Sequence, residues 1–346
     1  MSTLPLLLDW LSASPDPDLG LLVLRNLIDD KARSRILVET FRDAPDAAQK
    51  LCLVVGTSRL LGDILTRNPD LVARLPYPEK LQTRPIPELT ATAKAAVEAR
   101  PNPEDRPRVI RRWKDRNLLG IAARDIAGFT DVRGVGEDLS KVAEATIGVA
   151  LEVIDPQVPF AVLGLGRLGG SEMSYGSDLD LVYVHAGSGA GAVEEANRVA
   201  NGLRTLLGGT TPSERIYEVD TALRPEGKGG ALVRSFEGHV AYWERSAQTW
   251  ERLAWTRART VGGDRALGDR LLDAIDPAVW GSGLRSDEIL DLRRIKARVE
   301  GERIPPGEDP KFHLKLGRGS LSDVEFTTQT LLLQYGIRTT CTTAAL

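Results

Sequence analysis

The hydrophobic pattern of this chain changes period near residue 159, and that change limits the folds it can adopt. Residues 19–145 place leucine, isoleucine and valine at helical spacing between proline-rich loops. Short apolar runs follow that are typical of strands: residues 159–164, 179–185 and 216–223. A helical pattern lies between the second and third runs, at residues 194–207, and helical spacing returns beyond Phe236.

We therefore expect an α+β protein, a mainly helical chain around a small mixed sheet with flanking helical bundles. The pattern predicts an N-terminal helical region over residues 1–145, a sheet-containing catalytic domain over 146–265 and a C-terminal helical region over 266–346. The last helical segment has no end signal before the final residue, so we expect the C-terminal region to be truncated.

Composition excludes several classes of protein. A formal net charge of -3 gives no basic excess for nucleic-acid binding. No apolar run reaches the length of a membrane span, and the apolar stretch near the N-terminus is too short and too acidic in its flanks for a signal peptide. Cys52 and Cys341 have no metal-ligand neighbours, which argues against a zinc site or a disulfide scaffold. We expect a cytoplasmic protein that binds neither nucleic acid nor membrane.

Paired carboxylates stand at the start of the second predicted strand. Asp178 and Asp180 are two residues apart, so on a strand they project to the same side. Two carboxylates this close repel each other unless a cation lies between them, and hard oxygen ligands suit Mg²⁺. Asp220, on the next run, supplies a third acid. We predict that these three residues are the metal ligands and the catalytic residues; the alternative is surface acids on an edge strand.

Such a site predicts chemistry on a nucleoside triphosphate. Three acids and two metal ions can organise in-line attack on an α-phosphate, one ion activating the acceptor hydroxyl and the other binding the triphosphate. Asp220 would orient or deprotonate that hydroxyl. Arg224 and Lys228 follow closely enough to offset the charge of the phosphates.

The glycines before the acids permit three interpretations. Gly164-x-Gly166-x-x-Gly169 matches the glycine spacing of a dinucleotide-binding turn. However, no long helix follows it, and no acidic residue occurs about twenty positions later. The glycines could also form a tight turn and nothing more. We favour a third reading, in which backbone N–H groups of Gly169 and Gly170 point at a triphosphate.

Residues 164–180, Gly-Leu-Gly-Arg-Leu-Gly-Gly-Ser-Glu-Met-Ser-Tyr-Gly-Ser-Asp-Leu-Asp, resemble the signature of the glutamine synthetase adenylyltransferase family, which belongs to the polymerase-β-like nucleotidyltransferases. Further segments match the family in the same order: residues 219–227, 249–252, 257–259 and 312–326. The resemblance implies a polymerase-β-like nucleotidyltransferase core. It places Asp178, Asp180 and Asp220 on the metal acids, and Gly169, Gly170 and Ser177 on the phosphate turn.

The resemblance also implies a reaction and its partners. Family members carry two catalytic halves: one transfers AMP from ATP to a tyrosine of glutamine synthetase, and the other removes it by phosphorolysis, which gives ADP. Implied with these are Mg²⁺, ATP as substrate, glutamine synthetase as protein substrate, and regulation by the PII signalling protein and by glutamine. The sequence around Tyr175-Gly176-Ser177 and Thr249-Trp250-Glu251 is more similar to that of the C-terminal, adenylylating half.

Alternatives to this function stay open at this point. They are the adenylyl-removing half, a glycosyltransferase that uses Asp-x-Asp to hold a nucleotide-sugar, and a non-catalytic regulatory module of the same fold. Asp323 and Glu325 match family acids, either for chemistry or for a structural salt bridge, and Ser320 replaces a usual family glycine. Trp243, Trp250 and Trp255 could stack on a base, although core packing is the more common role of such residues.

Overall fold

The computed structural model describes residues 4–44, 46–75, 77–100, 102–281 and 283–345. The chain divides into two compact units, Met1–Val142 and Ala143–Leu346. The division into three regions stays a prediction, although the sheet and the C-terminal helices share the second unit. Among the described residues, no helix has the length and apolar character to cross a membrane.

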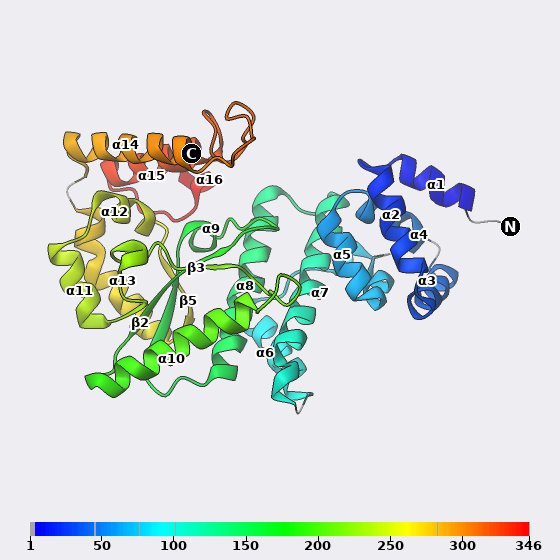
Figure 1. Cartoon of the computed structure of the whole chain (residues 1–346), viewed down its shortest axis with the longest axis horizontal. Coiled ribbons are helices and arrows are strands. Elements are labelled where there is room, and N and C mark those ends of the chain that lie inside the picture. The colour runs from blue at the N-terminus through cyan, green and yellow to red at the C-terminus, as the bar shows by residue number, and fades with distance from the viewer. Residues whose placement is uncertain (1–3, 45, 76, 101, 282, 346) are drawn as a thin grey trace. The chain divides into compact units, whose positions relative to one another are not determined.

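The first unit is built from helices, which confirms the helical pattern of residues 19–145 (Figure 1). Asp16 and Asp30 cap two of these helices by accepting hydrogen bonds from backbone amides of the first turn. The α-helices are α1 (Leu4–Ser12), α2 (Pro17–Ile28), α3 (Lys31–Asp43), α4 (Asp46–Val55), α5 (Arg59–Arg67), α6 (Ile86–Glu98) and α7 (Arg106–Ile126), with 3-10 turns η1 (Pro69–Arg74), η2 (Pro78–Lys80) and η3 (Pro103–Asp105). Helix α8 (Val132–Ile154) continues into the second unit.

The second unit contains a mixed sheet in the order β3-β2-β1-β5, with β4 also paired to β2. Its strands are β1 (Phe160–Gly164), β2 (Leu179–His185), β3 (Val219–Asp220), β4 (Val233–Ser235) and β5 (Arg259–Gly263). β1 pairs antiparallel with β2 and β5, whereas β3 and β4 both run parallel to β2. One edge of β2 is thus shared by two short strands, β3 at its start and β4 at its end.

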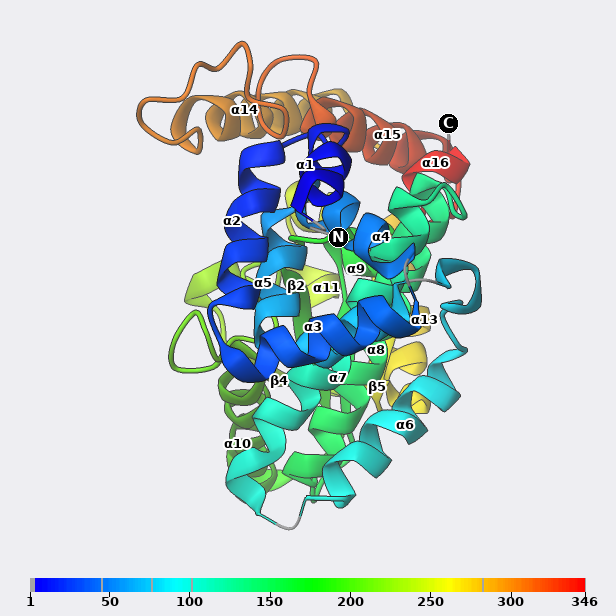
Figure 2. The same ribbon diagram turned by 90° about the vertical axis from the view of Figure 1, so that its right-hand side faces the viewer.

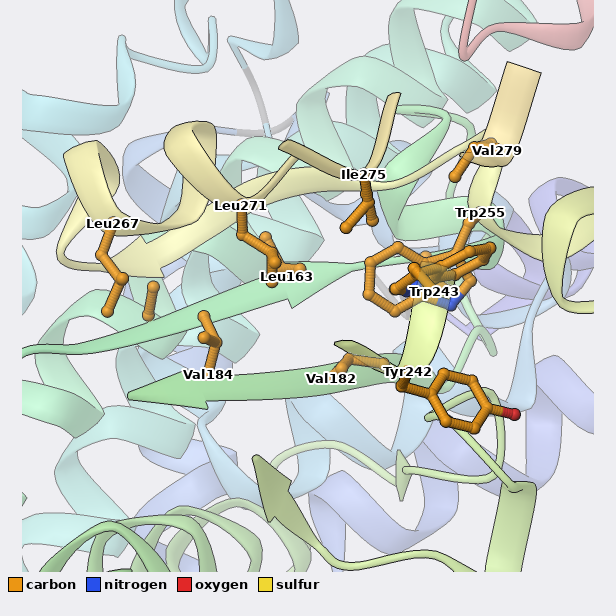
Figure 3. Close-up of a cluster of buried hydrophobic side chains, with 12 residues drawn as sticks. Leu163, Val182, Val184, Tyr242, Trp243, Trp255, Leu267, Leu271, Ile275 and Val279 are labelled. Carbon is orange, nitrogen blue, oxygen red and sulfur yellow. The ribbon is translucent and has the colours of Figure 1, made fainter. Parts of the chain in front are cut away.

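Helices cover both faces of this sheet. On one face, α11 (Phe236–Arg245) and α13 (Arg265–Trp280) pack over a core that includes Trp243, Trp255 and residues of β1 and β2 (Figure 3). On the other face lies α8, whose Ile147 occupies the space beside Gly262. Helix α10 (Gly189–Gly208) packs against β2, β3 and β4. Both faces of β2 are therefore buried, as its continuous apolar sequence predicts.

The remaining helices are short or pack mainly on other helices. They are the four-residue α9 (Gly166–Gly169), α12 (Thr249–Trp255), α14 (Ser286–Glu302), α15 (Leu321–Tyr335) and α16 (Thr342–Ala345), with the 3-10 turn η4 (Gly227–Gly229). Helices α14 and α15 lie beside each other (Figures 1 and 2), joined by an ion pair of 2.7 Å between Lys296 Nζ and Asp323 Oδ1. This pair supports the structural interpretation of Asp323.

Two sequence-based boundaries were wrong, and two strands were missed. The third predicted strand, residues 216–223, shortens to β3, because Ile216 and Tyr217 donate their amides to Leu207 O and the Asp220 carboxylate accepts the Ala222 amide, which turns the chain. Helix α10 begins at Gly189, before the predicted residue 194. β5 lies in the region beyond Phe236 that was predicted to be helical, and β4 was not predicted at all.

Candidate active site

Three carboxylates meet where β2 begins. Asp178 precedes β2, Asp180 lies within it, and Asp220 is the second residue of β3. Because β2 and β3 pair with Asp180 opposite Asp220, one oxygen from each of the three acids lies within 4.8 Å of the others. Across the described part of the chain, no other group of three His, Cys, Asp or Glu side chains comes together in this way. The predicted convergence is confirmed; the role of the acids as ligands stays a prediction.

The electrostatics of the triad favour a bound cation. Burial raises the pKa of Asp180, and repulsion from Asp178 and then from Asp220 raises it further, to about 7, although Lys315 offsets part of this effect. A positive ion between the acids would relieve both the burial and the repulsion. Asp220 Oδ1 accepts the Ala222 amide at 2.7 Å, a bond that fixes the orientation of this carboxylate. Oxygen ligands of this kind fit Mg²⁺.

Residues 164–172, called the glycine turn from here on, pack directly on the three acids. Gly166 has a φ of +53°, and a Cβ atom there would lie 2.0 Å from Asp180 Oδ2, so only glycine fits. A Cβ atom on Gly169 would lie 2.1 Å from the backbone oxygen of Arg257, and one on Gly170 would lie 2.9 Å from that of Thr340. The three glycines therefore allow close approach of three different segments.

The amides of the turn differ from our expectation. Gly169 N–H donates to Leu165 O at 2.8 Å, and Gly170 N–H donates to Gly166 O at 3.1 Å. Both groups close the short helix α9 and do not point outward as free donors. Contact of these two glycines with a nucleotide stays a prediction, but it cannot use these N–H groups while α9 is formed.

The other predicted nucleotide-binding residues have defined surroundings. Ser177 Oγ accepts the Ser174 amide at 2.9 Å, which shapes the loop just before Asp178. The Arg224 guanidinium donates to backbone oxygens of Thr221, Lys228 and Gly230, so it holds the turn after β3 in shape. Lys228 is exposed on that turn. Phosphate binding by Ser177, Arg224 and Lys228 stays a prediction.

Arginines that sequence reasoning left without a role hold the glycine turn in place. Arg257 forms an ion pair with Glu172, and its Nη1 lies 3.4 Å from Gly166 O and 3.8 Å from Glu325 Oε1. Arg259 donates from Nε to Gly169 O and from Nη2 to Leu168 O, both at 2.9 Å. The family match at residues 257–259, to which both arginines belong, was the only available signal, since their partners lie far away in the chain.

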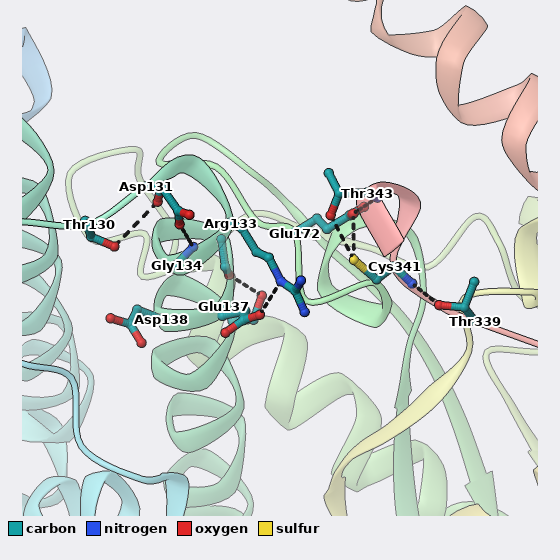
Figure 4. A network of polar contacts seen from close by, with 12 residues as sticks. Thr130, Asp131, Arg133, Gly134, Glu137, Asp138, Glu172, Thr339, Cys341 and Thr343 are labelled. Carbon is teal, nitrogen blue, oxygen red and sulfur yellow. Dashed lines mark hydrogen bonds and ion pairs between the residues drawn. The ribbon is translucent and has the colours of Figure 1, made fainter. Parts of the chain in front are cut away.

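The Glu172 carboxylate also contacts the C-terminal segment. It accepts hydrogen bonds from Thr343 N at 3.1 Å and from Cys341 Sγ at 3.3 Å (Figure 4). Burial by itself raises the pKa of Glu172, but Arg257, Thr343 and Thr342 outweigh it, and the pKa is lowered. Glu172 is therefore a charged link between the glycine turn and residues 341–343.

The tryptophans pack mainly as core residues. The rings of Trp243 and Trp255 meet edge to face with centroids 5.0 Å apart, and both side chains are buried. Trp250 is partly buried against a second cluster with Leu253 and Leu292. The core interpretation is confirmed for Trp243 and Trp255.

A sequence profile described as glutamate-ammonia ligase adenylyltransferase matches residues 48–274, more than half of the chain and all three acids. The chain belongs to this family. Two relatives, from Mycobacterium bovis and Mycobacterium marinum, are 40% and 41% identical to this chain over 96% of its length. A protein of Cutibacterium acnes is 37% identical over 99%. Each is named bifunctional glutamine synthetase adenylyltransferase/adenylyl-removing enzyme.

The chain spans about a third of the length of these relatives, 35% of the two mycobacterial proteins and 36% of the third. The predicted family membership is confirmed.

Proposed function

We propose that this chain transfers AMP from ATP to a tyrosine of glutamine synthetase, with two Mg²⁺ ions held by Asp178, Asp180 and Asp220, and so takes part in the control of nitrogen assimilation. The observation that carries the proposal is the meeting of three carboxylates from paired strands in a member of an adenylyltransferase family. Bound Mg²⁺ would supply charge for the triphosphate and a lowered pKa for the acceptor hydroxyl.

The residues of the chain have separate tasks in this proposal. Asp178, Asp180 and Asp220 hold the ions, and the Asp220 carboxylate also orients the tyrosine hydroxyl or accepts its proton. Lys228, exposed on the turn after β3, would offset the charge of the phosphates, and Arg224, which holds that turn through its backbone contacts, would add to the same positive charge. Ser177 and the glycine turn would form the wall against which the triphosphate lies.

The direction of transfer and the partners belong to the proposal as well. We favour the adenylylating direction because the sequence around residues 175–177 and 249–251 resembles that of the adenylylating half of the family. Phosphorolytic removal of AMP, which releases ADP, is the second candidate because the relatives carry both activities in their name. Regulation by PII, a cytoplasmic location and a core of polymerase-β-like type are further parts of the same hypothesis.

Incubation with labelled ATP, Mg²⁺ and glutamine synthetase tests the function, with Asp178→Asn as the matched variant. We expect label on the synthetase with the unaltered chain and a loss of at least about 100-fold with the variant, since one metal ligand is removed. Phosphate-dependent ADP release from modified synthetase, without transfer from ATP, would assign the opposite direction. A folded chain that shows neither reaction would refute the proposal.

A further inference from the structure

Four charged side chains are linked by ion pairs at the glycine turn. Arg257 is buried, with 3% of its side chain exposed, and it pairs with Glu172 on the turn and with Glu325 on α15. Arg167, also on the turn, lies 3.6 Å from the same Glu325 oxygen. Two cations and two anions thus form a chain of ion pairs that joins the turn, the α12–β5 connection and α15.

Arg257 contacts the turn through its backbone as well as its side chain. Its carbonyl oxygen occupies the space that a Cβ atom on Gly169 would need, and its Nη1 lies 3.4 Å from Gly166 O. Gly166 in turn lies against the Asp180 carboxylate, and the next amide back, Leu165 N–H, donates to Asp180 O at 2.9 Å. A shift of the turn would therefore move a predicted metal ligand.

We propose that Arg257 is a positioning residue for the metal site: it fixes residues 166–172 so that Gly166 holds the Asp180 carboxylate in place for a divalent cation. This rests on the proposed function only in requiring that the three acids bind such a cation. Groups that orient metal ligands without touching the metal commonly change metal affinity by about 10- to 100-fold when they are lost.

Arg252 provides a matched control. It lies on α12, five positions before Arg257, and is also largely buried, with 12% of its side chain exposed. It pairs with Glu288 at 2.9 Å and donates to Val279 O and Gly283 O, none of which belongs to the glycine turn. Its loss removes a comparable ion pair from the same unit and leaves the turn intact.

The experiment measures Mn²⁺ binding by electron paramagnetic resonance of the free ion, together with the thermal midpoint and AMP-transfer kinetics. We expect Arg257→Gln to bind Mn²⁺ about 10- to 100-fold more weakly than the unaltered chain. Arg252→Gln should keep its Mn²⁺ affinity despite a lowered thermal midpoint. Arg257→Lys keeps the charge without the planar fork and should weaken binding by about tenfold.

Two results would overturn the role of Arg257. One is an Arg257→Gln chain whose Mn²⁺ affinity stays within about twofold of the unaltered value; the other is an equal loss in Arg252→Gln, which would show a general effect of destabilisation. If Arg257→Gln does not fold, Arg257→Lys decides by the same comparison. An unaltered chain that binds no Mn²⁺ would refute the metal site, whereas Mn²⁺ binding without AMP transfer would refute only the proposed reaction.

Discussion

At the scale of single residues, Gly166 shows how closely the turn and the metal ligand are matched. Its φ of +53° lies in the region that favours glycine, and its missing side chain leaves room for Asp180 Oδ2. Gly189 has a similar backbone, with a φ of +80°, but nothing lies within 4 Å of its absent Cβ. The two glycines separate the effect of backbone strain from that of the contact with Asp180.

We therefore expect Gly166→Ala to abolish metal-dependent activity and Gly189→Ala to preserve it. Both variants should lose about 1–2 kcal/mol of unfolding free energy through the left-handed backbone, but only the first has to displace Asp180. Denaturant titration and metal-dependent AMP transfer measure the two effects. Equal activity in the two variants would show that Asp180 tolerates displacement.

At the scale of elements, the sequence predicted those strands whose apolar residues form uninterrupted runs. β1 and β2 are buried on both faces and were found within one residue of their ends. β4 has three residues, and β5 contains two glycines and pairs with β1 around an irregularity, so neither leaves an apolar run to detect.

The site was predictable to a similar extent. The three acids could be found because Asp178 and Asp180 are two residues apart at the start of β2 and Asp220 follows on a parallel neighbour. Arg257 and Glu172 are 85 positions apart, and their pairing depends on how α12, β5 and the glycine turn pack together. No local spacing rule contains that information.

His239 joins α11 to β2 and should make the fold sensitive to acid. Its Nε2 lies 3.2 Å from Tyr183 O, which can only accept, so Nε2 carries the proton. Burial lowers the pKa of His239 from 6.5 to about 4, although its bond to Tyr183 opposes this. Between these pH values the unfolded chain binds a proton that the folded chain does not, so the contribution of this residue to stability is lost as pH falls from 6.5 towards 4.

The free energy of unfolding should fall by up to about 3 kcal/mol over that range through this residue. His239→Gln keeps an N–H donor without the titration, so its stability should fall less than that of the unaltered chain. Denaturant midpoints at a series of pH values measure the difference. Parallel losses in both proteins would assign the acid sensitivity to other groups.

At the scale of the whole molecule, the two units should respond differently to a ligand. All the acids and arginines of the candidate active site lie in Ala143–Leu346. Calorimetry is expected to show two unfolding transitions, and Mg²⁺ with ATP at about 100 times its Kd should raise one of them by roughly 5–10 °C. Asp178→Asn should lose this shift. A single transition, or an equal shift of both, would contradict independent behaviour of the units.

The pairing of β3 with β2 also has a consequence for the order of the chain. Asp180 and Asp220 are 40 positions apart, and α10 lies between them. β3 has only two residues, so its backbone hydrogen bonds alone stabilise its pairing with the sheet only weakly. An ion shared by both acids would close that 40-residue loop as a reversible cross-link. Pairing of β3 with β2 would then be coupled to metal binding, so that metal would bind more tightly to the paired form and would in turn favour it.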